Sequence, residues 1–239
     1  NLKNYSESQK WFEKFIKILG IREDERYPDV LNRLGDCSYL SKNYEKAEKY
    51  YQDADKVTDK GNDYSVYQKA YALGLRKLYQ AKYDLLNQFE TKFPESERVD
   101  DAIFEAGKAC IALKKTDLAI STFSHLMEKY PDSPLSRKAG IQIALLYYNE
   151  GKAEEASTAY KKVIESYPGS EEAQMALSDL KMIHINNNTI SDYIDYTSKL
   201  SNPVNIGAGE QDSLAWLASE NLLMEGKNDQ ALNGFETYL

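Results

Sequence analysis

A repeat of 37 residues constrains this chain more than any other feature of its sequence. Pro94, Pro131 and Pro168 lie 37 positions apart, and each follows an aromatic residue and precedes a serine by two positions. Several coincidences that share one period indicate an internal repeat, which has to be recognised before shorter motifs are interpreted. The same step relates further pairs of similar residues: Gly107 and Ala144, Ala119 and Ala156, and Phe123 and Tyr160.

The order of residues within one period resembles the tetratricopeptide repeat. In that family each unit carries two small residues, then an aromatic residue, then a proline at its end. Small side chains let two helices approach closely, and proline ends a helix because it has no N–H to donate. The resemblance implies an all-α, right-handed superhelical solenoid of helix-turn-helix repeats. It rests on Gly107, Ala119, Phe123 and Pro131, and then on Ala144, Tyr147, Ala156, Tyr160 and Pro168.

Composition agrees with a helical protein and disfavours some partners. The chain has 239 residues, with 12 glycines and only six prolines, and it is rich in Ala, Glu, Lys, Leu and Tyr. Its net charge of −8 disfavours a partner with a phosphate backbone, so we expect no nucleic-acid binding. The sequence has no apolar run long enough to span a bilayer, so we expect no direct membrane span.

The repeat pattern predicts one continuous solenoid over residues 1–239. Lys82 stands where a small residue is expected, which predicts a looser helix crossing or a local shift of register. Tyr193 and Thr197 replace the small and aromatic residues of a later unit. The expected units are a partial repeat at 1–26, repeats at 28–62, 63–97, 98–134, 135–170 and 171–205, and a truncated repeat at 210–239.

The pattern also predicts the weak points of the array. Residues 201–209 form a longer polar loop, and we expect a hinge there. Both ends of the sequence cut through a repeat, which suggests a fragment of a longer protein. A solenoid normally needs polar terminal faces, but Trp11, Phe15 and Phe235 lie in the terminal helices. We therefore expect an apolar patch on at least one end, which would allow end-to-end self-association.

Residues with catalytic or metal-binding potential do not gather in this sequence. Cys37 and Cys110 fall in non-adjacent repeats, so we expect two buried free thiols and no disulfide. His125 and His184 also lie apart, and we expect packed or solvent-facing side chains. The sequence shows neither zinc-ligand spacing nor a phosphate-binding loop. We expect no enzyme activity, catalytic residue, metal or cofactor.

A binding surface is therefore the main functional candidate. The resemblance implies that the first helix of each unit lines a concave groove. Tyr64, Tyr67 and Tyr71 share one helical face, which suits either recognition or packing against the neighbouring helix. Asp36 argues against a groove that clamps a peptide carboxylate. The implied groove residues are Asn32, Asp36, Tyr64, Tyr67, Tyr71, Phe104, Lys108, Ile141, Leu145 and Trp216, and the same rule adds Met175 and Met182.

Several strings resemble tetratricopeptide proteins of the bacterial cell envelope, related to Tol-Pal system proteins and outer-membrane assembly lipoproteins of Bacteroidetes. They are L-N-R-L-G-D-C at 31–37, Y-Q-K-A-Y-A-L-G-L at 67–75, E-Q-D-S-L-A-W at 210–216 and the aromatic-P-x-S boundaries. The resemblance implies a non-enzymatic interaction scaffold in the periplasm, near the outer membrane, with a protein or peptide partner. Two alternatives stay open: a cytoplasmic adaptor, and a regulatory domain of a larger signalling protein or enzyme.

Overall fold

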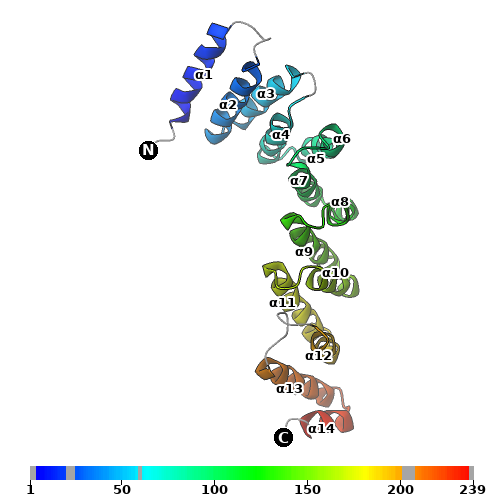
Figure 1. Ribbon diagram of the computed structural model, residues 1–239. Coiled ribbons are helices and arrows are strands. Elements are labelled where there is room, and N and C mark those ends of the chain that lie inside the picture. Colours follow the sequence, from blue (N-terminus) through cyan, green and yellow to red (C-terminus); the bar gives the residue numbers. More distant parts are fainter. Residues whose placement is uncertain (1–3, 20–24, 59–60, 201–207, 237–239) are drawn as a thin grey trace. The chain divides into compact units, whose positions relative to one another are not determined.

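The computed structural model describes residues 4–19, 25–58, 61–200 and 208–236. Within these ranges the chain consists of α-helices joined by turns, without a β-strand (Figure 1). The predicted all-α repeat fold is thereby confirmed. The helices form two compact units, Asn1–Pro131 and Asp132–Leu239. That the whole chain is one continuous solenoid stays a prediction.

In the first unit, a single helix precedes three pairs. Helix α1 packs against α2, and the pairs are α2 with α3, α4 with the divided helix α5 and α6, and α7 with α8. The bounds are α1 Tyr5–Leu19, α2 Tyr27–Leu40, α3 Tyr44–Lys56, α4 Asp63–Leu75, α5 Tyr79–Leu86, α6 Phe89–Lys92, α7 Val99–Ala112 and α8 Thr116–Lys129.

The second unit consists of three further pairs. Helix α9 pairs with α10, α11 with α12, and α13 with α14. Their apolar residues, from Ile141 to Leu214, form one continuous core. The bounds are α9 Pro134–Asn149, α10 Ala153–Ser166, α11 Glu171–Asn186, α12 Ile190–Ser198, α13 Ala208–Met224 and α14 Asn228–Glu236.

The aromatic-P-x-S motif forms the boundary between pairs, as the sequence predicts. Tyr130 and Tyr167, which precede proline, leave the helical conformation and end α8 and α10. Ser133 and Ser170 then cap α9 and α11 by accepting the backbone N–H groups of the first turn. Ser96 instead donates its hydroxyl to Asp63 at 2.6 Å.

Each turn inside a helix pair passes through one residue in the left-handed conformation. The φ values at these six positions lie between +55° and +77°. Glycine takes up this conformation without a Cβ penalty, whereas lysine does so at a cost. The recurrence of one backbone geometry fixes the register of the repeats. The positions are Lys42, Lys77, Lys114, Gly151, Asn188 and Gly226.

The predicted contacts between small and aromatic residues are present at the helix crossings. Ala119 and Ala156 have no exposed surface, and Phe123 and Tyr160 are buried beside them. A Cβ added to Gly107 would lie 2.5 Å from Phe123, so only glycine fits there without a rearrangement. The small and aromatic residues of these two pairs therefore pack as the pattern predicts.

The consensus departures are accommodated in the core. Lys82 is buried, and its Cδ lies 3.2 Å from the position that a Cβ on Gly74 would occupy. The lysine stem fills the crossing that we expected to be loose. The second helix of this pair is divided between α5 and α6 (Figure 1). Tyr193 and Thr197 are also buried.

The predicted weak points are only partly visible. Residues 201–207, most of the expected hinge, lie outside the described residues, as do residues 237–239. On α1, Trp11, Phe15 and Ile18 are exposed, so the expected apolar patch is present at this end. Self-association through the patch stays a prediction.

Candidate binding surface

The structure narrows the predicted groove surface. The resemblance implied ten groove residues, with packing left open for the three tyrosines, and three of the ten are buried because neighbouring helices cover them. The buried residues are Asn32, Tyr67 and Ile141. The half-buried residues are Asp36, Tyr64, Tyr71, Phe104 and Leu145, and the exposed ones are Lys108 and Trp216.

Asp36 joins the first two helix pairs. Its carboxylate accepts hydrogen bonds from the hydroxyls of Tyr51 at 2.9 Å and Tyr64 at 2.7 Å. Burial, followed by the neighbouring Asp36 carboxylate, raises the pKa of both tyrosines. The buried Asn32 likewise accepts a hydrogen bond from Ser65 at 2.7 Å. These polar groups hold α2 and α4 together and are already satisfied within the protein.

The tyrosine face of α4 mainly serves packing. The hydroxyls of Tyr67 and Tyr71 lie 3.1 Å apart, and their ring centroids are separated by 5.0 Å. Tyr67 also contacts the ring of Phe89, with a centroid separation of 6.2 Å. Of the two alternatives for this face, the structure favours packing at Tyr67, while Tyr64 and Tyr71 keep part of their surface exposed.

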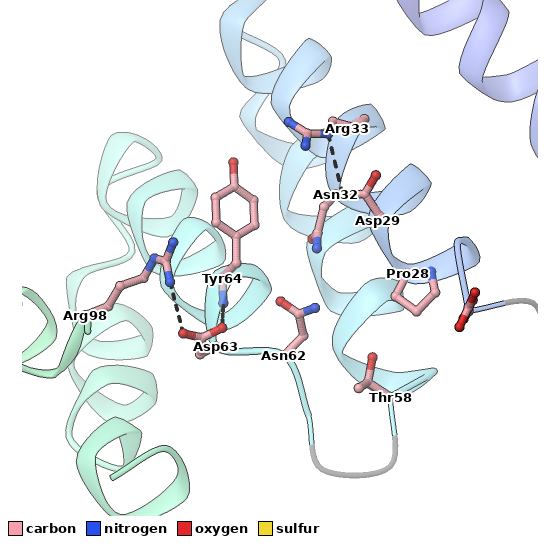
Figure 2. A pocket seen from close by; sticks show the side chains of 10 residues that line it. Pro28, Asp29, Asn32, Arg33, Thr58, Asn62, Asp63, Tyr64 and Arg98 are labelled. Carbon is pink, nitrogen blue, oxygen red and sulfur yellow. Dashed lines mark hydrogen bonds and ion pairs between the residues drawn. The ribbon is translucent and has the colours of Figure 1, made fainter. Parts of the chain in front are cut away.

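A polar pocket of about 520 Å³ lies at the N-terminal ends of α2 and α4 (Figure 2). Arg98 pairs with Asp63 at 3.0 Å, and Arg33 pairs with Asp29 at 3.5 Å. Burial raises the pKa of Asp63, but hydrogen bonds from Ser96, the Tyr64 backbone and Arg98 outweigh it and lower the pKa. The pocket holds mutually paired charges. Its lining residues are Glu25, Pro28, Asp29, Asn32, Arg33, Thr58, Asn62, Asp63, Tyr64 and Arg98.

Two lysines converge on one buried carboxylate where α4, α5 and α7 meet. Glu105 is 6% exposed and Lys82 is 7% exposed, and the two form an ion pair. Lys108 reaches the other oxygen of Glu105 at 2.6 Å. Burial alone would raise the pKa of Glu105, but hydrogen bonds from Lys108 and Lys82 outweigh it, and the net shift is downward. The Lys82 ammonium also lies 5.3 Å from the centroid of the Tyr71 ring.

The second unit has an apolar pocket of about 190 Å³ between α9, α10 and α11. Tyr148 is 45% exposed and Met182 is 50% exposed at its rim. Asp179 supplies a carboxylate, and burial, followed by the charge of this carboxylate, raises the pKa of Tyr160. The lining residues are Leu145, Tyr148, Tyr160, Asp179, Met182 and Ile183.

Leu145 is a member of this pocket that the sequence pattern predicted, whereas Tyr148 and Asp179 were missed. A comparison of residues two repeats apart would have drawn attention to Asp179, because Glu105 stands 74 positions earlier. Met175 and Trp216 are further exposed apolar residues in this unit. The arrangement can hold an apolar side chain of a partner and offer it one negative charge.

The cysteine and histidine side chains, which could take part in catalysis or metal binding, are buried or contact other residues of the protein. Cys37 and Cys110 are buried free thiols, as expected, and burial raises the pKa of each. His125 contacts Glu90 at 2.8 Å, and His184 is buried with its Nδ1 2.8 Å from the Thr189 hydroxyl. Within the described ranges, no group of three or more His, Cys, Asp or Glu residues could hold a metal ion. None of the described helices is long and apolar enough to cross a membrane.

Two family models match parts of the chain. The family described as outer membrane lipoprotein (YfiO) matches residues 96–189, and the tetratricopeptide repeat matches residues 28–60. No curated protein matches the chain.

Solved structures show the same fold. A tetratricopeptide repeat protein from Parabacteroides merdae has a TM-score of 0.58 and 14% identity, over 98% of this chain and 86% of that chain. MamA from Desulfovibrio magneticus RS-1 has a TM-score of 0.54 and 14% identity, over 72% of this chain and 92% of that chain. YrrB, described as having an unusual peptide-binding site, has a TM-score of 0.52 and 15% identity, over 94% and 97%.

The paired helices, their common register and the surface pockets define a helical-repeat protein. With the tetratricopeptide-repeat match at residues 28–60 and the similar solved structures, the chain has a tetratricopeptide-repeat fold. Its central part is similar to outer membrane lipoproteins.

Proposed function

We propose that this protein is a non-enzymatic scaffold of a bacterial cell envelope, and that it binds a peptide or protein partner. The fold supports the scaffold role, because each repeat exposes one wall of paired helices to a partner. The similarity of residues 96–189 to outer membrane lipoproteins supports the envelope location. Within the envelope, this similarity favours a location in the periplasm near the outer membrane.

The apolar wall of the second unit is the observation that carries the binding role. Tyr148 and Met182 are exposed at the pocket beside Leu145, on the first helices of two successive pairs, and Met175 is exposed two turns before Met182 on α11. Scattered exposed apolar residues are ordinary on protein surfaces, but several around one pocket indicate an interaction site. The polar groups of the first unit are better satisfied within the protein, so the second unit offers the stronger binding surface.

A matched pair of methionine variants tests this proposal. Met182→Glu puts a charge into the apolar wall, whereas Met224→Glu makes the same change at an exposed site at the end of α13. A partner is first captured from the envelope fraction and identified, and its affinity for the purified protein is then measured. We expect at least a tenfold loss with Met182→Glu and no loss with Met224→Glu. Equal affinities for both variants would contradict binding at this wall.

The location is tested separately. Fractionation of the native cells, followed by antibody detection, should recover the protein with the envelope. Recovery in the cytoplasmic fraction would leave the scaffold role in place and overturn the envelope assignment.

A further inference from the structure

Two helix junctions of this protein correspond residue by residue. The junction of α4, α5 and α7 and the junction of α9, α10 and α11 are related by two 37-residue steps. The internal turns confirm this register, because Lys77 and Gly151 are the left-handed residues of the two pairs. The corresponding residues are Tyr71 and Leu145, Gly74 and Tyr148, Lys82 and Ala156, Leu86 and Tyr160, Glu105 and Asp179, and Lys108 and Met182.

In the first junction the protein fills the site with its own lysine. The Lys82 stem packs at Gly74, its ammonium pairs with Glu105, and the same ammonium lies over the Tyr71 ring. A long apolar stem with a cationic end suits a site that combines apolar walls with a carboxylate. Lys82 therefore acts as a resident occupant.

In the second junction the acid is kept but both lysines are absent. Asp179 stands in the place of Glu105, while Ala156 and Met182 stand in the places of Lys82 and Lys108. Ala156 has no exposed surface, and a pocket of about 190 Å³, lined by Leu145, Asp179 and Met182 among others, opens in this junction. A cavity of about 150 Å³ suffices for benzene, so this pocket has room for an alkyl stem.

We propose that this pocket takes a lysine or arginine side chain from a partner protein, with its stem against Leu145 and Met182 and its charge at Asp179. This inference rests on the proposed function, since it specifies the partner chemistry at the same wall. The exposed Tyr148 ring at the rim can add a cation–π contact. The net charge of −8 further favours a basic partner segment.

Short peptides that differ at one residue test the inference. The probes are acetyl-Gly-Ala-X-Ala-Gly-amide with X as lysine, norleucine or glutamate, titrated to about 10 mM. Binding is followed by NMR of the methionine methyl groups. Met182 lies in the pocket, and Met224, which is 84% exposed, serves as an internal control. We expect the lysine peptide to bind about tenfold more tightly than the norleucine peptide, because an ionic hydrogen bond is added.

Variants at Asp179 complete the experiment. Asp179→Asn should reduce the affinity for the lysine peptide to that for the norleucine peptide. Asp179→Lys should make the glutamate peptide the tightest binder of the three. Equal or tighter binding of norleucine by the wild type would show a merely apolar site and overturn the inference. A Met182 methyl that no peptide shifts would overturn it as well.

The inference and the proposed function can fail independently. If Met182→Glu abolishes binding of a natural partner but Asp179→Asn does not, the apolar wall binds partners, and the inference that a basic side chain enters the pocket is wrong. If neither Met182→Glu nor Asp179→Asn changes the affinity for the native partner while the wild type still binds the lysine peptide, the pocket does bind a basic side chain. The proposal that the partner binds at this wall then fails.

Discussion

The junction at Lys82 and the junction at Ala156 share one frame and differ in what fills it. In the first, Lys82 and Lys108 surround the buried Glu105, and the site is closed by the protein itself. In the second, Asp179 and apolar residues line an open pocket. The same positions in the repeat therefore form both sites, and the side chains at these positions distinguish a closed, ion-paired core from an open pocket.

The two junctions also differ in how strongly the loss of their carboxylate should lower the stability of the protein. A buried ion pair gains little over an apolar core, but the loss of one partner leaves an uncompensated charge. The first junction is therefore sensitive to single substitutions at Glu105. Asp179 is half-buried beside an open pocket, where solvent reduces the cost of changing its charge. We expect the first junction to govern stability and the second to govern binding.

The largest expected effect comes from neutralising the buried carboxylate. Glu105→Gln should destabilise the protein by about 3 kcal/mol, because Lys82 then keeps a buried charge without a counterion. Asp179→Asn is the matched change and should cost below about 1 kcal/mol. Urea unfolding measures both. The double variant Lys82→Met with Glu105→Gln should recover most of the loss, and an unrecovered loss would contradict the charge explanation.

A transplanted lysine tests the correspondence directly. Ala156→Lys is made in the wild type, where the lysine lies beside Asp179, and in the Asp179→Asn variant, which offers no carboxylate at that position. Ala156 has no exposed surface. We expect Ala156→Lys to be less destabilising by about 2 kcal/mol in the wild type, because only there its ammonium gains a carboxylate partner. Equal losses of unfolding free energy would mean that the second junction cannot accept a lysine.

Acid should affect the wild type more than the Glu105→Gln variant. Because the net pKa shift of Glu105 is downward from 4.5, its ionised form stabilises the fold at higher pH. That contribution is lost as the pH falls through and below 4.5, where the unfolded chain takes up the extra proton. The wild-type slope of unfolding free energy should exceed the variant slope by at most about 1.4 kcal/mol per pH unit. Identical slopes would contradict the direction of this shift.

The smallest expected effect lies at the turns that set the register. Lys114 and Gly151 are corresponding left-handed residues, with φ of 57° and 75°. Lys114→Gly should stabilise the protein by about 1 kcal/mol, and Gly151→Lys should destabilise it by a similar amount. Thermal unfolding measures both changes. Shifts of the same sign would show that side-chain contacts, rather than backbone strain, dominate these turns.

The sequence pattern predicted the secondary structure well, but it predicted less well which residues of the binding surface are exposed. Prolines and serines at fixed spacing act locally, so the ends of α8 and α10 and the caps of α9 and α11 could be predicted. Exposure is not local. Tyr67 and Ile141 occupy the expected faces, yet neighbouring helices bury them. Lys82 looked like a defect in the pattern, because its partner Glu105 lies in another repeat and no local rule pairs the two.

The sequence by itself determined the repeat period, the helix pairs and the small-to-aromatic crossings, because these depend on residue size and backbone preference within one unit. Only the tertiary structure decided which acids form ion pairs within the protein and which line a pocket. Glu105 and Asp179 occupy the same place in the pattern, and their different roles follow from residues that packing brings to them. Electrostatic and packing contacts between helices depend on distances that a linear pattern does not contain.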